Sequence, residues 1–323
     1  MPNTLHRASG QASLSWRCSL LGLAWAVCVD IGAVPAEAQE TQHGSSTLPA
    51  SGGTADHRLQ WRWARLGPLD YATTAVLGAG ALYVEFFTEQ RDDPRWTGPV
   101  WGDRAVRDWL VADTRGGRNR ANVYSDWCTV FTWGMLWTEN LLVPAIDDWN
   151  LDVAWHLSVI NLQAAAVSGL LTRGGNRLAA RERPYVQECE RDPDYNDNCF
   201  RGETSSFPSG HTSTAFTAAA LGCAHHLQLG LYGGGAYDVA VCAAVATAAA
   251  ASGTLRLVAD RHYATDVYAG VAVGVGSGLA LPLLLHYRTP ADSHGVAGAT
   301  GFRWAVTPFV QGDGPGLSVY GQF

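Results

Sequence analysis

RLVADRHYATD, residues 256–266, is a charged segment at the junction of two long apolar stretches of the sequence. The stretches run from Tyr237 to Val258 and from Val267 to Tyr287. Their length of about twenty residues and their lack of strand-like alternation indicate helices. The segment therefore predicts a connection between two adjacent helices, and it places His262 and Asp266 at a helix end.

Four more apolar stretches of this kind precede these two along the chain. They run approximately from Leu69 to Phe87, Trp127 to Ile146, Val153 to Thr172 and Thr212 to Tyr232. Ala and Leu dominate them, so the predicted fold class is all-α, with six helices. If neighbouring helices run antiparallel, the end of the third, the start of the fourth and the turn between the fifth and sixth meet on one side.

The chain has 323 residues, 47% of them hydrophobic, and no long polar linker in its middle. One helical domain is therefore predicted over residues 57–290. Residues 39–56 are rich in Ser, Thr and Gly, which predicts a flexible segment. In the tail, residues 291–323, two short runs flank QGDGPG at residues 311–316, which predicts a β-hairpin.

The N-terminus has the pattern of an export signal. Arg7 and Arg17 precede the apolar run CSLLGLAWAVCV, residues 18–29, and Ala-Glu-Ala at residues 36–38 offers a small-x-small cleavage site. The run is short for a membrane span, so a cleaved signal peptide over residues 1–38 is favoured over a retained anchor. The predicted location is the periplasm.

Two of the six apolar stretches are long and apolar enough to cross a membrane: residues 237–255 and 267–285. If all six crossed, however, the outer loop between the first and second would be rich in arginine, the reverse of the positive-inside bias. A soluble or membrane-associated periplasmic domain is therefore favoured. The alternative is an integral inner-membrane protein whose active site faces the periplasm.

Charge and cysteine content limit the possible partners and metals. The net charge is −7 and every basic residue is arginine, which argues against a nucleic-acid surface. In an oxidising compartment, Cys189 and Cys199 predict a disulfide across a short polar loop. Cys128, Cys223 and Cys242 lie in apolar runs and are predicted to be buried, inert thiols. The cysteine spacing matches no zinc pattern.

Two further polar clusters accompany residues 256–266: NRLAARERP at residues 176–184 and PSGH at residues 208–211. All three lie at ends of predicted helices, which suits phosphoryl transfer. Ser209 and Gly210 begin the fourth helix, where free backbone N–H groups and the helix dipole favour an anion. Arginines in the other two clusters, Arg183 and Arg256, can supply forked, permanently charged donors to phosphate oxygens.

The two histidines of these clusters suit nucleophilic and acid catalysis. His262 and Asp266 are four residues apart, so on a helix the carboxylate can orient the imidazole. An oriented neutral histidine is a nucleophile, and His211 is then available to protonate the leaving oxygen.

Together, the three clusters resemble the signature of the type 2 phosphatidic acid phosphatase superfamily, which includes lipid phosphatases, bacterial acid phosphatases and vanadium haloperoxidases. That signature is Lys-x6-Arg-Pro, Pro-Ser-Gly-His and Ser-Arg-x5-His-x3-Asp, and the resemblance spans roughly residues 161–287. It implies a helical bundle of the phosphatidic acid phosphatase/haloperoxidase type, with His262 as a phosphohistidine-forming nucleophile, Asp266 as its partner and His211 as general acid. It further implies a phosphate site formed by Arg183, Arg256, Ser209 and Gly210.

The chain departs from this signature at two positions. Asn176 stands where the first motif has lysine, and Leu255 stands where the third has serine. Arg177 is the predicted replacement for the lysine in the phosphate site, with Arg181 as the other candidate.

The predicted function is a phosphatase that needs no metal or other cofactor. Its substrate is a phosphate monoester or diphosphate, either a soluble small molecule or a lipid phosphate. The alternative is a vanadate-dependent haloperoxidase that uses the same pocket, although the short span between the first two motifs leaves little room for the extra domain expected there.

Overall fold

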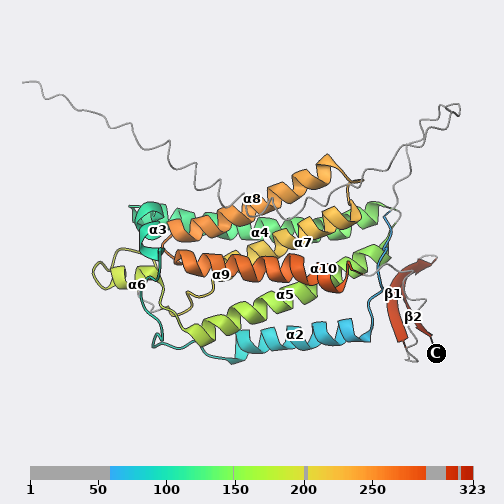
Figure 1. The fold of residues 1–323 in the computed structure, drawn as a ribbon, viewed down its shortest axis with the longest axis horizontal. Coiled ribbons are helices and arrows are strands. Elements are labelled where there is room, and N and C mark those ends of the chain that lie inside the picture. The colour runs from blue at the N-terminus through green and yellow to red at the C-terminus, as the bar shows by residue number, and fades with distance from the viewer. Residues whose placement is uncertain (1–58, 148, 200–202, 289–302, 312–313, 323) are drawn as a thin grey trace, which may run out of the picture. The chain divides into compact units, whose positions relative to one another are not determined.

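The computed structural model describes residues 59–147, 149–199, 203–288, 303–311 and 314–322 (Figure 1). These residues are predominantly helical, which confirms the all-α prediction. The predicted signal peptide and the predicted flexible segment lie outside the described residues.

Each apolar stretch forms a helix. The long helices are α2 (Pro68–Phe87), α4 (Arg115–Ile146), α5 (Leu151–Ala179), α7 (Gly210–Leu229), α8 (Ala236–Val258) and α9 (Ala264–Val275), and α9 continues through a π-helical turn (Gly276–Ala280) into α10 (Leu281–Leu285). Two short helices, α3 (Asp103–Leu110) and α6 (Pro184–Cys189), were not predicted.

The largest difference from the predicted boundaries is at the start of α4, which begins at Arg115 rather than Trp127. The added turns are polar, and apolar periodicity does not reveal them. Thr114 caps the helix by accepting a hydrogen bond from the Gly117 backbone N–H at 3.1 Å. Arg118 then donates to the Ala112 carbonyl at 2.7 Å, which fixes the first turn.

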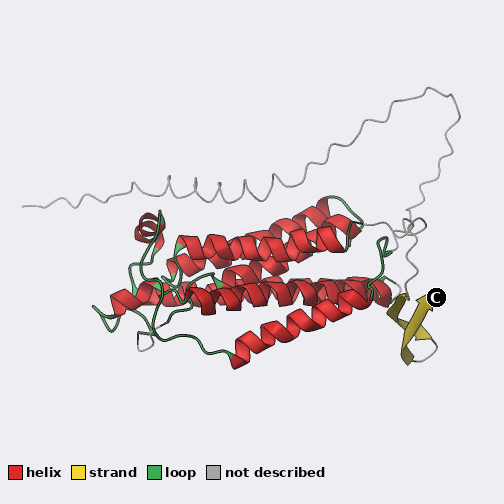
Figure 2. Ribbon diagram, turned by 60° about the horizontal axis from the view of Figure 1, so that its bottom comes forward, coloured by secondary structure: helices red, strands yellow, loops and turns green. Residues whose placement is uncertain are grey.

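Helix α7 is in contact with α4, α5, α8 and α9 and therefore lies at the centre of the helical packing (Figure 1). Apolar side chains of α7 pack on both sides, with Leu221 against Ile160 of α5 and Phe216 against Ala249 of α8. Figure 2 shows these helices side by side along their lengths.

Helices α2 and α5 run parallel along one edge of the helical packing. Trp155 near the start of α5 donates to the Tyr71 hydroxyl of α2 at 3.0 Å. Near the other end, Arg173 of α5 forms an ion pair with Glu85 of α2 at 2.6 Å. The two helices therefore reach the same end of the structure with their C-termini.

The end of α5, the start of α7 and the connection between α8 and α9 meet, as the sequence predicts. The Asn176 amide of α5 donates to the Pro208 carbonyl before α7 at 3.0 Å. The Ser209 backbone N–H donates to the Asp266 carbonyl of α9 at 2.9 Å. These contacts join all three polar clusters at one end of the helices.

The structure contains two disulfides among the described residues. Cys189–Cys199 was predicted and is present. Cys223–Cys242 joins α7 to α8, so the prediction of inert thiols at these two positions is wrong. The two helices bring the Cα atoms to 4.6 Å, a proximity that sequence position alone does not reveal. Cys128 is a free thiol.

The described part of the tail forms two strands, β1 (Arg303–Gln311) and β2 (Gly314–Gln322). They pair antiparallel, with Val306 opposite Val319.

Much of the helical surface is apolar. None of the residues of α2 is buried, and large apolar side chains are exposed on α2 and α4: Leu69, Val76, Phe86, Phe87, Trp127, Val130, Phe131 and Ile146. Helices α5, α8 and α9–α10 are each long and apolar enough to cross a membrane. Because an apolar surface of this extent is unusual for a protein surrounded by water, it indicates membrane association.

Candidate active site

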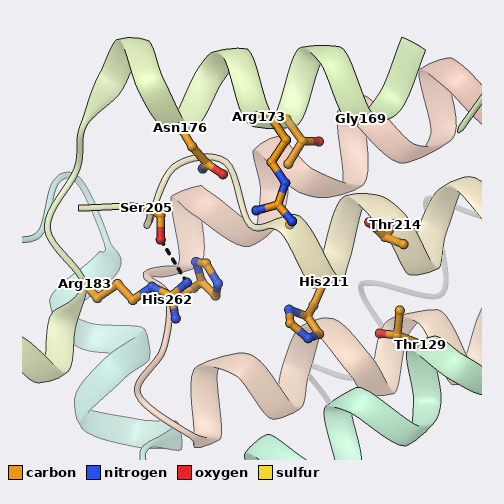
Figure 3. Close-up of a pocket in the computed structure, with 11 residues that line it drawn as sticks. Thr129, Gly169, Arg173, Asn176, Arg183, Ser205, His211, Thr214 and His262 are labelled. Carbon is orange, nitrogen blue, oxygen red and sulfur yellow. Dashed lines mark hydrogen bonds between the residues drawn. The ribbon is translucent and has the colours of Figure 1, made fainter. Parts of the chain in front are cut away.

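A cavity of about 210 Å³ lies where the three polar clusters meet (Figure 3). Its lining residues are Thr129, Gly169, Thr172, Arg173, Asn176, Arg183, Ser205, Gly210, His211, Thr214 and His262. Four predicted site residues are among them: His262, His211, Arg183 and Gly210. Asp266, Arg256 and Ser209 are buried behind the lining, and Arg177 contacts the end of α2 instead.

His262 lies in the connection between α8 and α9 and is almost completely buried. Its Nδ1 donates to the Ser206 carbonyl at 2.8 Å, so in the neutral ring the lone pair is on Nε2. Burial, followed by the positive charges of Arg183 and Arg256, lowers the pKa of His262 well below 6.5. The ring is therefore held neutral in the tautomer that a nucleophilic Nε2 requires.

Asp266 does not bind His262 directly, contrary to the prediction. The nearest approach of its carboxylate to Nδ1 is 3.9 Å. Its Oδ2 instead accepts from the Ser206 hydroxyl at 2.6 Å and from the Tyr263 backbone N–H at 2.8 Å. Because α9 begins at Ala264, Asp266 caps that helix and His262 precedes it, so the four-residue spacing does not bring the two side chains together. Asp266 acts on His262 through Ser206.

Within the PSGH segment, His211 presents its ring to the cavity, whereas Gly210 can present only backbone groups. The Ser209 hydroxyl shares a hydrogen bond of 2.8 Å with that of Thr212, and Ser209 is fully buried. Its backbone N–H donates to the Asp266 carbonyl, so neither the hydroxyl nor the N–H of Ser209 is directed to the cavity, unlike the predicted phosphate-binding role. Gly210 lines the cavity as the first residue of α7, where backbone N–H groups lack helical acceptors.

Gly175 allows this segment to approach α5 closely. A Cβ at Gly175 would lie 2.7 Å from Cδ of Pro208, which is closer than two carbon atoms can pack. The glycine therefore fixes how near PSGH lies to the end of α5.

Two of the predicted phosphate-binding arginines have different surroundings. Arg183 lines the cavity, where it donates to the Ser205 hydroxyl at 3.1 Å and forms an ion pair with Glu203 at 2.7 Å. Arg256 is buried and donates to the amide oxygen of Asn122 at 2.8 Å. Its charge nevertheless acts on His262, so it contributes to the potential of the cavity.

Neither candidate for the missing lysine reaches the cavity. Arg177 donates to the Thr88 carbonyl at 3.1 Å and to Gln90. Arg181 is fully buried and forms ion pairs with Asp103 at 2.7 Å and with Asp266. The amide of Asn176 itself contacts the Pro208 carbonyl.

Arg173 lines the cavity while its Nε keeps the ion pair with Glu85 of α2, and sequence reasoning missed it. It lies three residues before Asn176 on α5, so both residues face the same side of the helix. Figure 3 shows its guanidinium extending from α5 toward the middle of the cavity, across from His211. The helical spacing was the signal that could have identified it.

His211 has a partner that the sequence reasoning also missed. Its Nε2 lies 2.8 Å from Oδ1 of Asp126 on α4. The same carboxylate oxygen is 3.5 Å from Arg256. Helix α4 contains none of the three motifs, so motif spacing alone could not identify Asp126.

Arg181 connects α3 and α9 beneath the cavity. Its guanidinium lies 3.9 Å from the ring centroid of Trp96 and 4.2 Å from that of Tyr263. The carboxylates of Asp103 and Asp266 and the two aromatic rings surround the guanidinium, and Arg181 is inaccessible to solvent. Arg181 thereby fixes the position of the Asp266 carboxylate, which in turn accepts the hydrogen bond from the Ser206 hydroxyl.

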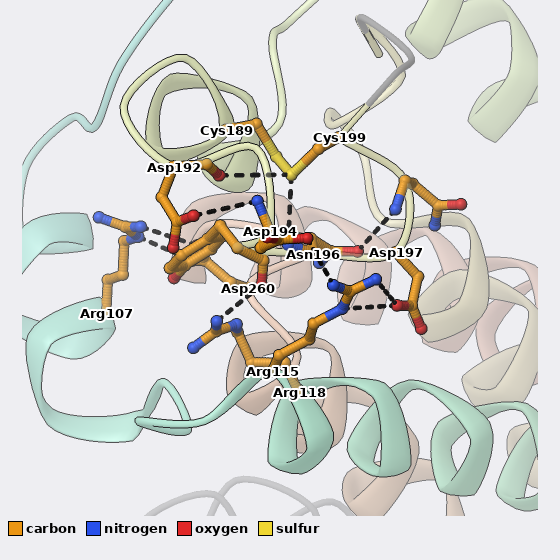
Figure 4. Close-up of a disulfide and its surroundings, with 12 residues drawn as sticks. Arg107, Arg115, Arg118, Cys189, Asp192, Asp194, Asn196, Asp197, Cys199 and Asp260 are labelled. Carbon is orange, nitrogen blue, oxygen red and sulfur yellow. Dashed lines mark hydrogen bonds and ion pairs between the residues drawn. A yellow bond between two sulfur atoms is a disulfide. The ribbon is translucent and has the colours of Figure 1, made fainter.

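The loop closed by Cys189–Cys199 supports the residues just before His262 (Figure 4). Within this loop the Tyr195 hydroxyl donates to Asp260 at 2.9 Å. Arg107 of α3 forms an ion pair with the same carboxylate at 2.7 Å. Asp260 has positive φ, 57°, so these contacts stabilise a sharp turn two residues before the histidine.

The described residues contain no group of three or more His, Cys, Asp or Glu side chains arranged to hold a metal ion. The cavity is instead lined by arginine, histidine and hydroxyl groups, a donor set that fits an oxyanion such as phosphate.

Known proteins resemble the part of the chain that forms this cavity. A segment of the chain is 44% identical over 71 residues to "Lipid A 1-phosphatase" of Porphyromonas gingivalis. This match covers 22% of the chain and 14% of that protein. No solved structure matches the chain. The family model of the PAP2 superfamily matches residues 154–290, a segment that includes all three motifs.

Proposed function

We propose that the chain is a phosphatase that hydrolyses a phosphate monoester or diphosphate through a phosphohistidine on His262. The observation that carries the proposal is the tautomer of His262, whose Nδ1 is committed to the Ser206 carbonyl in a cavity lined by arginines. Its Nε2 attacks phosphorus, the bond to the leaving oxygen breaks, and that oxygen takes a proton from His211. Water then attacks the phosphohistidine while His211 accepts a proton from it, the P–N bond breaks, and orthophosphate leaves.

The surrounding charges support this reaction. Arg183 and Arg173 extend into the cavity from different elements, and the start of α7 adds backbone N–H groups at Gly210. Donors fixed around a phosphoryl group stabilise the charge that spreads over its equatorial oxygens in the transition state. We assign Arg173 the role that lysine has in the family signature.

The exposed apolar helices and the partial match to a lipid A phosphatase support a lipid-linked phosphate as the substrate. The two disulfides support an oxidising compartment, and therefore export. We propose that the protein is held in or on a membrane with the cavity on the exported side.

Replacing Arg173 with alanine is expected to lower kcat/KM by on the order of 10²-fold, because one fixed donor to the phosphoryl group is lost. Arg173→Lys keeps the charge and is expected to recover part of this loss. The control is Arg177→Ala, one turn further along α5, because Arg177 also contacts the α2 end but does not line the cavity. Steady-state kinetics on p-nitrophenyl phosphate test this, and a larger loss for Arg177→Ala than for Arg173→Ala would contradict the assignment.

The pH dependence follows from the lowered pKa of His262. A histidine whose pKa lies below 6.5 stays neutral, and therefore nucleophilic, at mildly acidic pH. The acid limb of kcat/KM is expected below pH 6.5, and Arg183→Gln should move it to higher pH, because removing a positive charge raises the pKa of His262. The position of the limb, rather than its height, is the measurement. An unmoved limb in Arg183→Gln would exclude His262 as the titrating group.

A further inference from the structure

Asp126 contacts the His211 side chain beside the cavity. It belongs to α4, outside the segment that matches the PAP2 superfamily, and its Oδ1 is 2.8 Å from Nε2 of His211. The pair is partly exposed, with 39% of the His211 side chain and 47% of the Asp126 side chain accessible. At this distance Nε2–H donates to the carboxylate, so Nδ1 is the nitrogen left to act on a substrate.

The charges around His211 show why a carboxylate matters there. Besides burial, Arg256 of α8, Arg183 before α6, Arg173 of α5 and Arg261 beside His262 lower the pKa of His211. Solvent contact of the half-exposed ring weakens this effect. A general acid must nevertheless carry a proton at the moment the leaving oxygen departs. Asp126 provides a negative charge at hydrogen-bond distance, and a bound phosphate adds more.

We propose that Asp126 is a positioning residue that turns His211 and keeps it protonated, so that Nδ1 delivers the proton to the leaving oxygen. This inference rests on the proposed phosphatase function. The two histidines of the site then have different partners. The Ser206 carbonyl keeps His262 in its neutral, nucleophilic form, and the Asp126 carboxylate keeps His211 protonated. Asp126 comes from a helix that carries none of the signature motifs.

A substitution of Asp126 can be separated from a loss of phosphate binding. Besides His211, Asp126 has one ion-pair partner among the described residues, Arg256 at 3.5 Å. Arg256 also donates to Asn122 at 2.8 Å, one turn earlier on α4, so it keeps a partner when Asp126 is changed. Asp126→Asn should therefore alter His211 more than it alters the arginine.

The test compares Asp126→Asn with the unchanged protein on two substrates that differ in leaving group. An alkyl phosphate needs a protonated leaving oxygen, whereas p-nitrophenolate leaves without one. For the alkyl phosphate, kcat is expected to fall by on the order of 10²-fold and the alkaline limb of the pH profile to move to lower pH. For p-nitrophenyl phosphate the expected loss is less than about tenfold.

Three variants make the result specific. Asp126→Glu is expected to recover part of the loss on the alkyl phosphate. Asp126→Asn should have no further effect when His211 is already alanine, since interacting residues are not additive. Asp108→Asn, an exposed carboxylate on α3, is the control and should change neither substrate.

Equal losses on both substrates, or an unmoved alkaline limb, would overturn the role of Asp126 and would indicate that it acts only through Arg256. Failure of the proposed function would look different, because the His262 variants would then keep their activity.

Discussion

Replacing His262 with alanine is expected to lower kcat by on the order of 10⁴-fold or more, because the group that forms the covalent bond to phosphorus is lost. His262→Asn is the matched variant. Its side-chain amide can still donate to the Ser206 carbonyl, as Nδ1 does now at 2.8 Å, yet it offers no nucleophilic nitrogen. Both variants are expected to be inactive, and His262→Asn is expected to keep the stability of the unchanged protein.

The measurement is phosphate release by purified protein from p-nitrophenyl phosphate and from a lipid phosphate, with a chelator present. Acid-labile label on histidine after reaction with ³²P-substrate would identify the intermediate directly. Phosphate release that persists in His262→Asn would refute the phosphohistidine. Activity that requires vanadate, halide and peroxide would instead favour the haloperoxidase alternative.

Replacing Arg181 with methionine is expected to destabilise the protein by about 3–5 kcal/mol. Methionine fills similar space but leaves the carboxylates of Asp103 and Asp266 buried without their counter-charge. The expected change is large because all three side chains are inaccessible to solvent, so water cannot replace the lost partner. Thermal unfolding of the protein in detergent measures it.

Arg177→Met is the control for Arg181, since it removes an arginine from the same end of α5 that is only partly buried. Its expected cost is about 1 kcal/mol or less. Combining Arg181→Met with Asp103→Asn should recover part of the stability, because one buried charge is removed with its partner. Equal stability of Arg181→Met and Arg177→Met would show that the buried ion pairs contribute nothing.

The helices could be predicted, and so could the meeting of the three helix ends that carry the polar clusters, because both depend on local properties of the sequence. Apolar stretches of about twenty residues determine helices, and adjacent antiparallel helices bring alternate ends together. His262 and His211, which come from two different motifs, line the same cavity for this reason. The start of α4 was not predicted, because its polar first turns are stabilised by Thr114 and Arg118 rather than by apolar periodicity.

The misplaced residues depend on contacts that the motif spacing does not specify. The spacing of Asp266 suggested a direct bond to His262, but helix capping draws its carboxylate toward the Tyr263 N–H. The lysine position could be identified, but whether Arg173, Arg177 or Arg181 replaces it depends on what α2 and α3 offer as partners. Cys223 and Cys242 likewise pair only because α7 and α8 pack together.

The hydrogen bonds that join the three motifs have a further consequence for turnover. The Ser206 carbonyl accepts a hydrogen bond from His262, Asp266 binds both Ser206 and Ser209, and the Asn176 amide binds the PSGH segment, so the protein's own contacts fix the site. A rigid, preformed anion site loses little conformational entropy when it is filled. On the proposed function, released orthophosphate meets the same arginines and helix end as the substrate phosphoryl group did. The rigidity that favours the first chemical step therefore also favours retention of the product.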